Sequence, residues 1–466
     1  MLKATNLRLK YPSAPHKIFD GLNIEIKDKE KVLLLGPSGS GKSTLLNVLS
    51  GIVPRLIDLP MKYDALTISQ NAGVIFQDPD AQFCMPQVNE ELAFILENLQ
   101  TPREEMDIKI QEALTAVQLE VNPKQSIHQL SGGMKQKLAI AGTLLQQTDT
   151  LFLDEPTAML DTEATENLWQ LLRTLWKDQT VLIVEHKVEH IWDYVDRVLL
   201  MNHQGQIIQD GSPDEILKHY EDTLSAFGVW HPKAWNHAPK RWETQLDTPP
   251  SFKLQFLEGT IQRGKRKLYD VDHFKIQSGD WAIITGKNGT GKTTFFESLM
   301  QLIPYQGTVT FNQTPIRKLK FAASHLFLVY QNPELQFLQN SVYDEILINF
   351  KHHDLAAAQK EADDILERLD LTHVKDQHPF ELSMGQKRRL SVAVALSTSA
   401  DIILLDEPTF GLDSHNTFKL INLFQERIQN GQAIIMITHD PEIIARYPSK
   451  HFIIEQEKMY ESRGLQ

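Results

Sequence analysis

The sequence is poor in cysteine and has no long apolar run. Its 466 residues include one cysteine, Cys84. A single cysteine excludes a disulfide framework, an iron–sulfur cluster and a four-cysteine zinc site within one chain, and it suits a reducing cytosol. No uninterrupted apolar stretch reaches about 18 residues, and the first residues lack the apolar core of a signal peptide. We therefore expect no membrane span in this chain.

Positive charge is also scarce. Lysine and arginine number 47 against 60 aspartates and glutamates, which gives a formal net charge of −13. Such a surface repels phosphate backbones and anionic lipid, so we expect no nucleic-acid partner and no direct lipid insertion. Hydrophobic residues make up 41% and charged residues 23%, a globular balance. The length favours more than one domain.

The chain contains a long internal repeat. The segment 17–36 aligns with 267–286, and the alignment continues to the C-terminal parts of both halves. Self-similarity of this kind predicts two homologous domains, which we place at residues 1–230 and 251–466. Between them, residues 231–250 contain four prolines. This composition favours an extended, semi-rigid linker.

Short apolar runs alternate with amphipathic segments in each half, which predicts an α/β fold of parallel strands and crossover helices. The segment Thr101–Glu104 predicts a capping box with proline at the first helical position. Leucines 168, 171, 172 and 175 are spaced to lie on one face of a helix. The predicted buried strands are Val32–Leu35, Val74–Phe76, Leu151–Leu153, Val181–Val184, Trp281–Thr285, Leu326–Tyr330, Ile402–Leu405 and Ala433–Ile437.

Each half has a glycine-rich loop between a predicted strand and a predicted helix, the context of a phosphate-binding loop. Backbone N–H groups of such a loop bind phosphate, the lysine reaches the β and γ phosphates, and the following hydroxyl binds Mg²⁺. We therefore predict ATP and Mg²⁺ as cofactors. The first loop comprises Gly36, Pro37, Ser38, Gly39, Ser40, Gly41, Lys42, Ser43 and Thr44, and the second Gly286, Lys287, Asn288, Gly289, Thr290, Gly291, Lys292, Thr293 and Thr294.

Two predicted strands end in adjacent acids. Asp154 and Asp406 are placed to hold Mg²⁺, and the next residues, Glu155 and Glu407, are placed to polarise an attacking water. One such pair would more often be a solvated strand end. Two copies at matching distances from two phosphate loops favour catalysis.

The order of motifs resembles the nucleotide-binding domain of ABC ATPases over nearly the whole chain. In each half a phosphate loop is followed by Gln77 or Gln331, a serine–glycine signature that opens a helix, the Asp-Glu pair, and then His186 or His439. The resemblance implies two P-loop domains, each with a helical subdomain that carries the signature.

The resemblance also implies that each ATP is held by the phosphate loop of one domain and the signature of the other. It assigns Gln77 and Gln331 to the metal sites. It makes His186 and His439 contacts of the γ-phosphate. Asp161 and Asp413 would communicate between the domains. Site one would combine Lys42, Ser43, Gln77, Asp154, Glu155 and His186 with Ser383 and Gly385. Site two would combine Lys292, Thr293, Gln331, Asp406, Glu407 and His439 with Ser131, Gly132 and Gly133.

The sequence departs from the family pattern at a few positions. Met384 stands where glycine is usual in the second signature, and Met134 where glutamine is usual in the first. Tyr11 fits the aromatic residue that stacks on adenine, whereas the matching stretch 261–267 has no ring. The basic residues of that stretch favour a solvated hairpin over a nucleic-acid contact.

The segments after the two glutamines, 76–83 and 330–337, share an Asp/Asn-Pro turn followed by Gln-Phe. They resemble the ATPase subunits of energy-coupling-factor importers, which take up vitamins or transition-metal ions. A fused pair resembles in particular an ATPase for thiamine or hydroxymethylpyrimidine import. This implies a peripheral protein at the cytoplasmic face of the cell membrane, partnered by an energy-coupling transmembrane protein and a substrate-binding membrane subunit. Phe83 and Phe337 would lie at the docking face, with a buried core role as the alternative for each.

Three other classes share parts of the pattern. A tandem sugar-importer ATPase is the first alternative, although that family usually lacks the paired turn segments. A soluble translation-associated ABC ATPase would have a long basic helical linker, and a DNA-repair ABC protein would have coiled-coil or zinc insertions. The linker here is short and interrupted by prolines.

Overall fold

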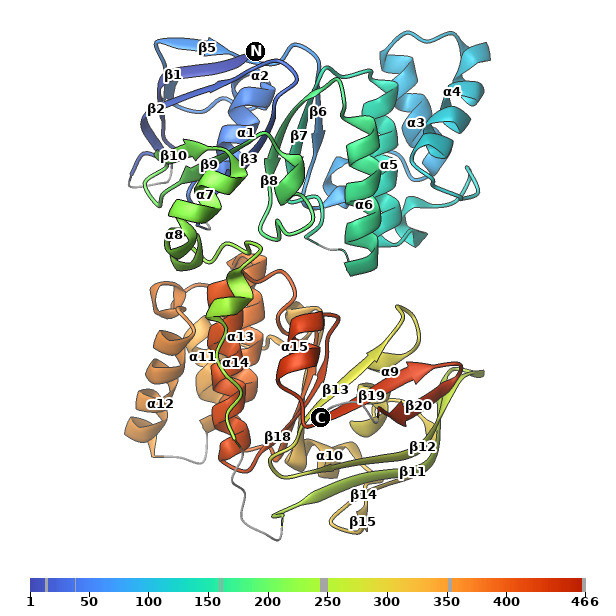
Figure 1. Cartoon of the computed structure of the whole chain (residues 1–466). Coiled ribbons are helices and arrows are strands. Elements are labelled where there is room, and N and C mark those ends of the chain that lie inside the picture. The colour runs from blue at the N-terminus through green and yellow to red at the C-terminus, as the bar shows by residue number, and fades with distance from the viewer. Residues whose placement is uncertain are drawn as a thin grey trace. The chain divides into compact units, whose positions relative to one another are not determined.

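The computed structural model describes residues 1–12, 16–37, 39–158, 160, 162–243, 250–350 and 354–462. They form two compact units (Figure 1). The first comprises Met1–His237 and Asp413–His415, and the second comprises Ala238–Leu412 and Asn416–Gln466. Both units combine parallel strands with crossover helices, so the predicted α/β class is confirmed.

A six-stranded sheet forms the centre of the first unit. Its strands are, in spatial order, β10 (Ile207–Gly211), β9 (Arg197–Met201), β3 (Lys31–Leu35), β8 (Thr180–Val184), β7 (Thr150–Asp154) and β6 (Ala72–Ile75). All neighbours pair in parallel except β10 with β9. The four strands predicted in this half are therefore confirmed, each within two residues of its expected bounds.

The continuous apolar runs exist because both faces of this sheet are covered. In β3, Leu33 and Leu35 pack into one hydrophobic cluster, whereas Val32 and Leu34 pack into another. Side chains alternate between the faces of a strand, so a strand buried on both sides needs an apolar residue at every position. The carboxyl ends of these strands then lie together at one edge of the sheet.

A smaller antiparallel sheet, which the sequence patterns did not predict, covers part of the first unit. It is built from β1 (Leu2–Leu9), β2 (Phe19–Ile26), β4 (Met61–Lys62) and β5 (Ala65–Thr67). Helices α3, α4 and α5 gather beyond the edge strand β6 (Figure 1). The helices of this half are α1 (Lys42–Ser50), α2 (Ile52–Arg55), α3 (Val88–Asn98), α4 (Arg103–Ala116), α5 (Gly132–Leu145), α6 (Thr162–Leu175), α7 (Pro213–His219) and α8 (Glu221–Ala226).

Two local helix predictions have different outcomes. The leucine face of α6 is confirmed, because Leu168, Leu171 and Leu172 are buried and Leu175 packs against the same cluster. The predicted capping box before α4 is wrong. The N-cap residue is Pro102 rather than Thr101, and no side chain caps this helix end.

The second unit joins both kinds of strand into one ten-stranded sheet. Its spatial order is β15 (Thr314–Pro315), β14 (Tyr305–Phe311), β11 (Lys253–Arg263), β12 (Arg266–Gln277), β20 (Lys458–Glu461), β19 (Lys450–Glu455), β13 (Trp281–Gly286), β18 (Ala433–Ile437), β17 (Ile402–Asp406) and β16 (Leu326–Val329). Strands β13, β18, β17 and β16 pair in parallel, which confirms the predicted strands of this half. Its helices are α9 (Lys292–Leu299), α10 (Leu319–His325), α11 (Val342–Leu347), α12 (Leu355–Arg368), α13 (Met384–Leu396), α14 (Ser414–Gln429) and α15 (Pro441–Arg446).

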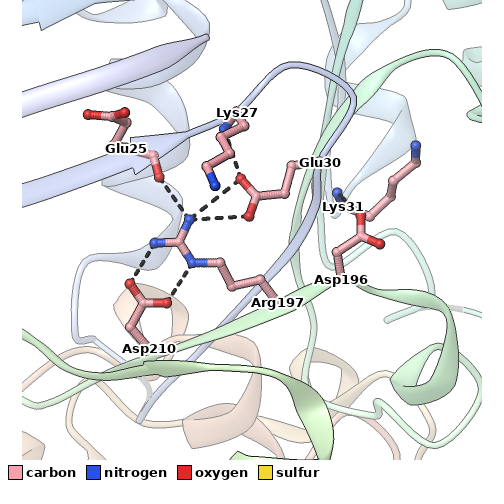
Figure 2. Close-up of polar contacts among 7 residues, drawn as sticks. All are labelled: Glu25, Lys27, Glu30, Lys31, Asp196, Arg197 and Asp210. Atoms are coloured by element: carbon pink, nitrogen blue, oxygen red, sulfur yellow. Dashed lines mark hydrogen bonds and ion pairs between the residues drawn. The ribbon is translucent and has the colours of Figure 1, made fainter.

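A network of charged residues closes the end of the first sheet that is opposite to the strands' carboxyl ends (Figure 2). The guanidinium of Arg197 donates to both carboxylate oxygens of Asp210 at 2.5 Å, to the backbone oxygen of Glu25 at 3.0 Å and to Glu30 at 3.3 Å. In the second unit the ammonium of Lys450 contacts Asp280 at 2.8 Å and donates to the backbone oxygen of Lys275 at 2.9 Å. The two halves thus tie matching strands together with different cations.

The residues around position 237 are packed rather than extended in solvent. In the first unit, Ser225 and His231 are hydrogen-bonded through Oγ and Nε2 at 2.9 Å. In the second unit the amide of Gln425 donates to the backbone oxygen of Lys240 at 3.2 Å and accepts from the N–H of Trp242 at 2.7 Å. Tyr447 donates its hydroxyl to the backbone oxygen of Pro239 at 2.6 Å. Residues 239–242 therefore lie against α14 and the end of α15.

In the part of the chain that the structure describes, no helix combines the length and the apolar character needed to cross a bilayer.

Candidate ATP sites at the carboxyl ends of the parallel strands

The first phosphate loop connects β3 to α1 and turns back on glycines. Gly39 and Gly41 have φ angles of 77° and 97°, in the left-handed region that favours glycine. A Cβ on Gly41 would lie 2.6 Å from Ile18 and 2.9 Å from Phe19, whereas a Cβ on Gly39 would face open space. The loop therefore needs glycine for its turn at one position and for its packing at the other. Ser38 lies outside the described residues.

The lysine of this loop points back into it. The ammonium of Lys42 donates to the backbone oxygens of Gly36 and Pro37, both at 2.9 Å. Burial lowers the pKa of this lysine from its ordinary value, while the charges of Glu155 and Asp154 oppose that effect. The loop thus concentrates one positive charge beside the N-terminus of α1, where a phosphate group would be favoured.

The second phosphate loop has the same geometry. Gly289 and Gly291 have φ angles of 78° and 99°, and α9 begins at Lys292. The ammonium of Lys292 donates to the backbone oxygens of Gly286 at 2.7 Å and Lys287 at 3.2 Å. The described residues of both predicted loops therefore share the glycine turns and the inward-pointing lysine expected of a phosphate-binding loop.

Each loop hydroxyl meets the first acid of the neighbouring strand end. Ser43 Oγ donates to Asp154 Oδ1 at 2.9 Å, and Thr293 Oγ1 donates to Asp406 Oδ2 at 2.6 Å. A hydroxyl and a carboxylate oxygen beside a phosphate loop are the hard oxygen ligands that Mg²⁺ takes, together with phosphate oxygens. The donor sets of both halves therefore fit the predicted metal.

The second acid of each strand end pairs with the predicted histidine. His186 Nε2 lies 2.9 Å from Glu155 Oε1, and His439 Nε2 lies 3.5 Å from Glu407 Oε1. The amide of Gln77 donates to Glu155 Oε2 at 2.8 Å. Burial works against ionisation of Glu155, yet the hydrogen bond and charge of His186 bring its pKa below the ordinary value. This carboxylate is therefore held in its basic form.

The backbone of both glutamates is strained. Glu155 and Glu407 have φ angles of 48° and 52°, which a residue with a side chain rarely adopts. Each is held there by its backbone N–H, which donates to Val184 at 2.8 Å or to Ile437 at 3.0 Å. Such strain costs about 1 to 3 kcal/mol and gathers at functional sites, which supports a catalytic role for these two acids.

The two signature segments open helices as predicted. Ser131 is the N-cap of α5, and its Oγ accepts from the N–H of Met134. Ser383 is the N-cap of α13 and forms a capping box with Gln386. Gly132, Gly133 and Gly385 lie in the first turns of these helices, where backbone N–H groups point outward. The pairing of each signature with the phosphate loop of the other domain stays a prediction, as does a role for Asp161, which lies outside the described residues.

The adenine-stacking prediction has a partial structural counterpart. The hydroxyl of Tyr11 is 3.1 Å from Thr44 Oγ1, so this ring lies beside the first phosphate loop. In the second half the matching residue, Ile261, is buried in β11, and residues 263–267 form an exposed hairpin end. Gln331 is exposed after β16.

The docking role of the two phenylalanines stays a prediction, and their burial favours the alternative of a core role. Phe337 is 8% exposed and contacts Phe380 edge to face, and the partly buried Phe83 packs against the hydrophobic cluster shared by the sheet and helices of the first unit. Both side chains therefore contribute to packing. The exposed apolar residues in and directly after the second segment are Leu335 and Leu338, at 68% and 77%.

Three buried glutamates near these sites were not predicted. Glu91 accepts the N–H groups of Cys84 and Met85, and Glu345 accepts those of Leu338 and Gln339, so each holds the end of a turn segment. Glu185 lies directly before His186 and contacts Thr157. Glu91 and Glu345 could have been found from the sequence, because they occupy matching positions of the internal repeat after the two Gln-Phe pairs.

Comparison with known proteins supports the interpretation of the chain as two ATP-binding domains. A family model described as ABC transporter matches residues 19–158 and 269–410. The chain is 33% identical to "Putative HMP/thiamine import ATP-binding protein YkoD" of Bacillus subtilis strain 168, over 97% of this chain and 90% of that protein. It is 29% identical to "Putative ABC transporter ATP-binding protein" of Methanosarcina mazei, over 98% and 88%.

Solved structures share the fold. The archaeal ribosome recycling factor aABCE1, in complex with the ribosomal stalk protein aP1, superposes with a TM-score of 0.68 at 21% identity, covering 97% of this chain and 89% of that chain. At that identity the likeness concerns the fold alone.

The fold and the paired sites define a P-loop ATPase with two nucleotide-binding domains in one chain. The chain belongs to the ABC transporter family of ATP-binding proteins, and it is an ATPase.

Proposed function

We propose that this chain is the ATP-binding and ATP-hydrolysing subunit that energises an importer of the energy-coupling-factor type for a vitamin or vitamin precursor. The observation that carries the proposal is the repetition, in one chain, of a phosphate loop whose hydroxyl meets a strand-end aspartate and whose neighbouring glutamate pairs with a histidine. The relative from Bacillus subtilis, whose name assigns it to HMP/thiamine import, supports the substrate class.

The residues of the first site have separable roles in this proposal. Lys42 and the N–H groups of the loop bind and orient the phosphates. Ser43 and Asp154 would hold Mg²⁺, which when bound offsets the negative charge of the phosphates. Glu155 orients the attacking water and accepts its proton, and His186 holds Glu155 in place. The second site assigns the same roles to Lys292, Thr293, Asp406, Glu407 and His439.

The proposed partners are membrane proteins, an energy-coupling transmembrane protein and a substrate-binding subunit, at the cytoplasmic face of the membrane. Leu335 and Leu338 support this, because they expose two apolar side chains, three residues apart, on the stretch that follows Gln331. An apolar pair on a segment next to an ATP site suits a partner helix that must respond to nucleotide.

The catalytic part of the proposal is tested by changing Glu155 and Glu407 together to Gln. Loss of a preorganised catalytic contact costs about 10²- to 10³-fold in rate, so turnover should fall at least that far while ATP binding persists. Hydrolysis is measured by phosphate release and binding by a fluorescent ATP analogue. Undiminished hydrolysis in the double variant would contradict the assignment.

The transport part is tested separately. The chain should co-purify with integral membrane proteins from detergent-solubilised membranes and should sediment apart from ribosomes. Uptake of labelled thiamine or hydroxymethylpyrimidine by cells that hold the assembled importer should require Glu155 or Glu407. Sedimentation with ribosomes and no membrane partner would contradict this function and favour a translation factor.

A further inference from the structure

A buried carboxylate lies directly behind the glutamate–histidine pair of the first site. Glu185 follows strand β8 and is 3% exposed. Its Oε1 accepts hydrogen bonds from the hydroxyl and the backbone N–H of Thr157, the latter at 3.3 Å. Its Oε2 accepts from the backbone N–H of His186 at 2.8 Å. Both carboxylate oxygens therefore accept hydrogen bonds, each from a different segment.

These bonds join the two segments that carry Glu155 and His186. Thr157 lies two residues beyond Glu155, after strand β7, and His186 lies after strand β8. The side chains of Glu155 and His186 meet at 2.9 Å across the same two segments. Because Glu185 accepts hydrogen bonds from Thr157 on one segment and from His186 on the other, it restricts how far these segments can shift against each other.

The second half has a different residue at this place. The matching position is Thr438, which is also buried. Its side chain is two bonds shorter than that of glutamate, and its hydroxyl accepts the N–H of Asp440 at 3.2 Å within its own turn. The pair beside it, His439 and Glu407, is 3.5 Å apart rather than 2.9 Å. The two halves thus support matching catalytic groups in unlike ways.

We propose that Glu185 is a positioning residue of the first ATP site, which sets the placement of His186 and Glu155 for hydrolysis there. The inference rests on the ATP hydrolysis proposed above. Glu185 acts through the backbone of His186 and through Thr157, and it touches neither the phosphates nor the attacking water. Because a displacement of about 1 Å in a catalytic group can cost about 10²-fold in rate, its removal should lower kcat and leave ATP affinity nearly unchanged.

The test uses the full chain with Glu407→Gln, so that turnover reports on the first site. Into this background we place Glu185→Gln, which keeps the shape of the side chain, and Glu185→Thr, which copies the second half. Glu30→Gln is the matched control: Glu30 is a largely buried carboxylate of the same unit that accepts the N–H of Lys27 at 2.8 Å, at the opposite end of the sheet. The steady-state kcat, the KM for ATP and the Tm are measured for each.

We expect Glu185→Thr to lower kcat by about tenfold or more, Glu185→Gln to lie between it and the background, and KM to change by less than about twofold. The control should keep the background kcat. A kcat unchanged in both Glu185 variants, or a raised KM at constant kcat, would overturn the proposal. If Glu185→Thr shows no cooperative melting, Glu185→Gln decides: a threefold loss of kcat supports the role, and an unchanged kcat removes it.

Failure of this proposal can be told apart from failure of the proposed function. Adding Glu155→Gln to the same background should abolish turnover whatever Glu185 does. If it does not, the assignment of the catalytic glutamates is wrong. If it does, while the Glu185 variants behave as the control, only the positioning role is lost.

Discussion

At the scale of single residues, the first site combines burial with a cluster of ionisable groups. Burial raises the pKa of the Glu185 carboxyl to about 7, and the nearby charge of Glu155 adds to this, while Thr157 and the backbone and charge of His186 oppose it. Burial likewise raises the pKa of Asp154 to about 6, against the hydrogen bond from Ser43. Ionising these side chains in the folded chain therefore costs stability that an exposed carboxyl would not cost.

This environment predicts a pH-dependent effect of Glu185→Gln on stability. The pKa of Glu185 is higher in the folded chain than its ordinary value of 4.5. Below pH 4.5 the carboxyl is protonated in both the folded and the unfolded chain and costs no stability. As the pH rises from there through about 7, ionisation favours the unfolded chain and the fold loses stability. The variant lacks this cost. Its Tm minus that of the parent should therefore increase between pH 5 and pH 8, by about 3 °C or more.

Differential scanning calorimetry of both proteins across this pH range measures that difference. A difference that stays constant, or that falls with rising pH, would show that the carboxylate is not disfavoured in the folded chain.

Sequence reasoning found some of these residues and missed others for physical reasons. The contact of Ser43 with Asp154 was predictable, because a loop and a strand end of one parallel sheet meet at the same edge. Glu185 was not, because a carboxylate at a strand end is usually solvated, and only packing by other segments buries it. Phe337 shows the converse: its place beside a turn suggested exposure, but the helical subdomain covers it.

At the scale of elements, the strands of the parallel sheets were predictable because both faces are buried. Strand β18 (Ala433–Ile437) matches its expected bounds, and β16 ends one residue early. The antiparallel strands escaped detection because only one face of each is buried, as the alternating burial of β2 shows. The cap of α4 was misplaced because Pro102 itself takes the N-cap position, which sequence spacing cannot distinguish from the first helical one.

The exposed leucines of the second turn segment give a prediction about partner docking. Changing Leu335 and Leu338 together to Ser should weaken co-purification with the proposed membrane subunits, because interface anchors contribute about 2 kcal/mol or more each. The Tm and the ATPase rate of the isolated chain should change little, since both side chains are largely exposed. Leu355→Ser, at an exposed position on α12, serves as the control.

The buried Phe337 provides the contrast for this experiment. Phe337→Ala should lower the free energy of unfolding by about 3 to 5 kcal/mol, as buried aromatic truncations do. Retained partner binding in the double serine variant would remove the leucines from the docking surface.

The segment that lies on α14 gives a second element-scale prediction. Gln425 binds it at two backbone atoms, so Gln425→Ala should destabilise the second unit by about 1 to 3 kcal/mol and speed proteolytic cleavage within residues 238–243. Gln429→Ala is the control, because within the described residues the Gln429 side chain donates one hydrogen bond to this segment, to the backbone oxygen of Glu243. Limited proteolysis followed by mass spectrometry locates the cuts. Equal cleavage rates in the two variants would contradict an anchoring role.

At the scale of the whole molecule, the two halves carry matching but unlike sites in one chain. The first half has glycines at both positions after the signature serine, and the second has Met384 at the first of them, 48% exposed. A fused chain supplies both halves in a fixed ratio. The two sites can therefore differ in sequence, since neither half has to supply both kinds of site.

This arrangement predicts the stoichiometry of the proposed importer. One copy of the chain should be present for each energy-coupling membrane subunit, because a single copy already brings two complete sets of ATP-binding motifs. Native mass spectrometry of the detergent-solubilised complex measures the ratio. Two copies per membrane subunit would contradict a role in which both halves of one chain work together.

The cation that closes each sheet shows one contact that the two halves share while their residues differ. Arg197 in the first half and Lys450 in the second reach the same backbone oxygen position, and each meets an acid of the same turn, Glu30 or Asp280. Neither the base nor the acid is identical between the halves, yet the bond is kept. The two halves therefore keep the same contact with different side chains, so their likeness is recorded more faithfully by contacts than by residue identity.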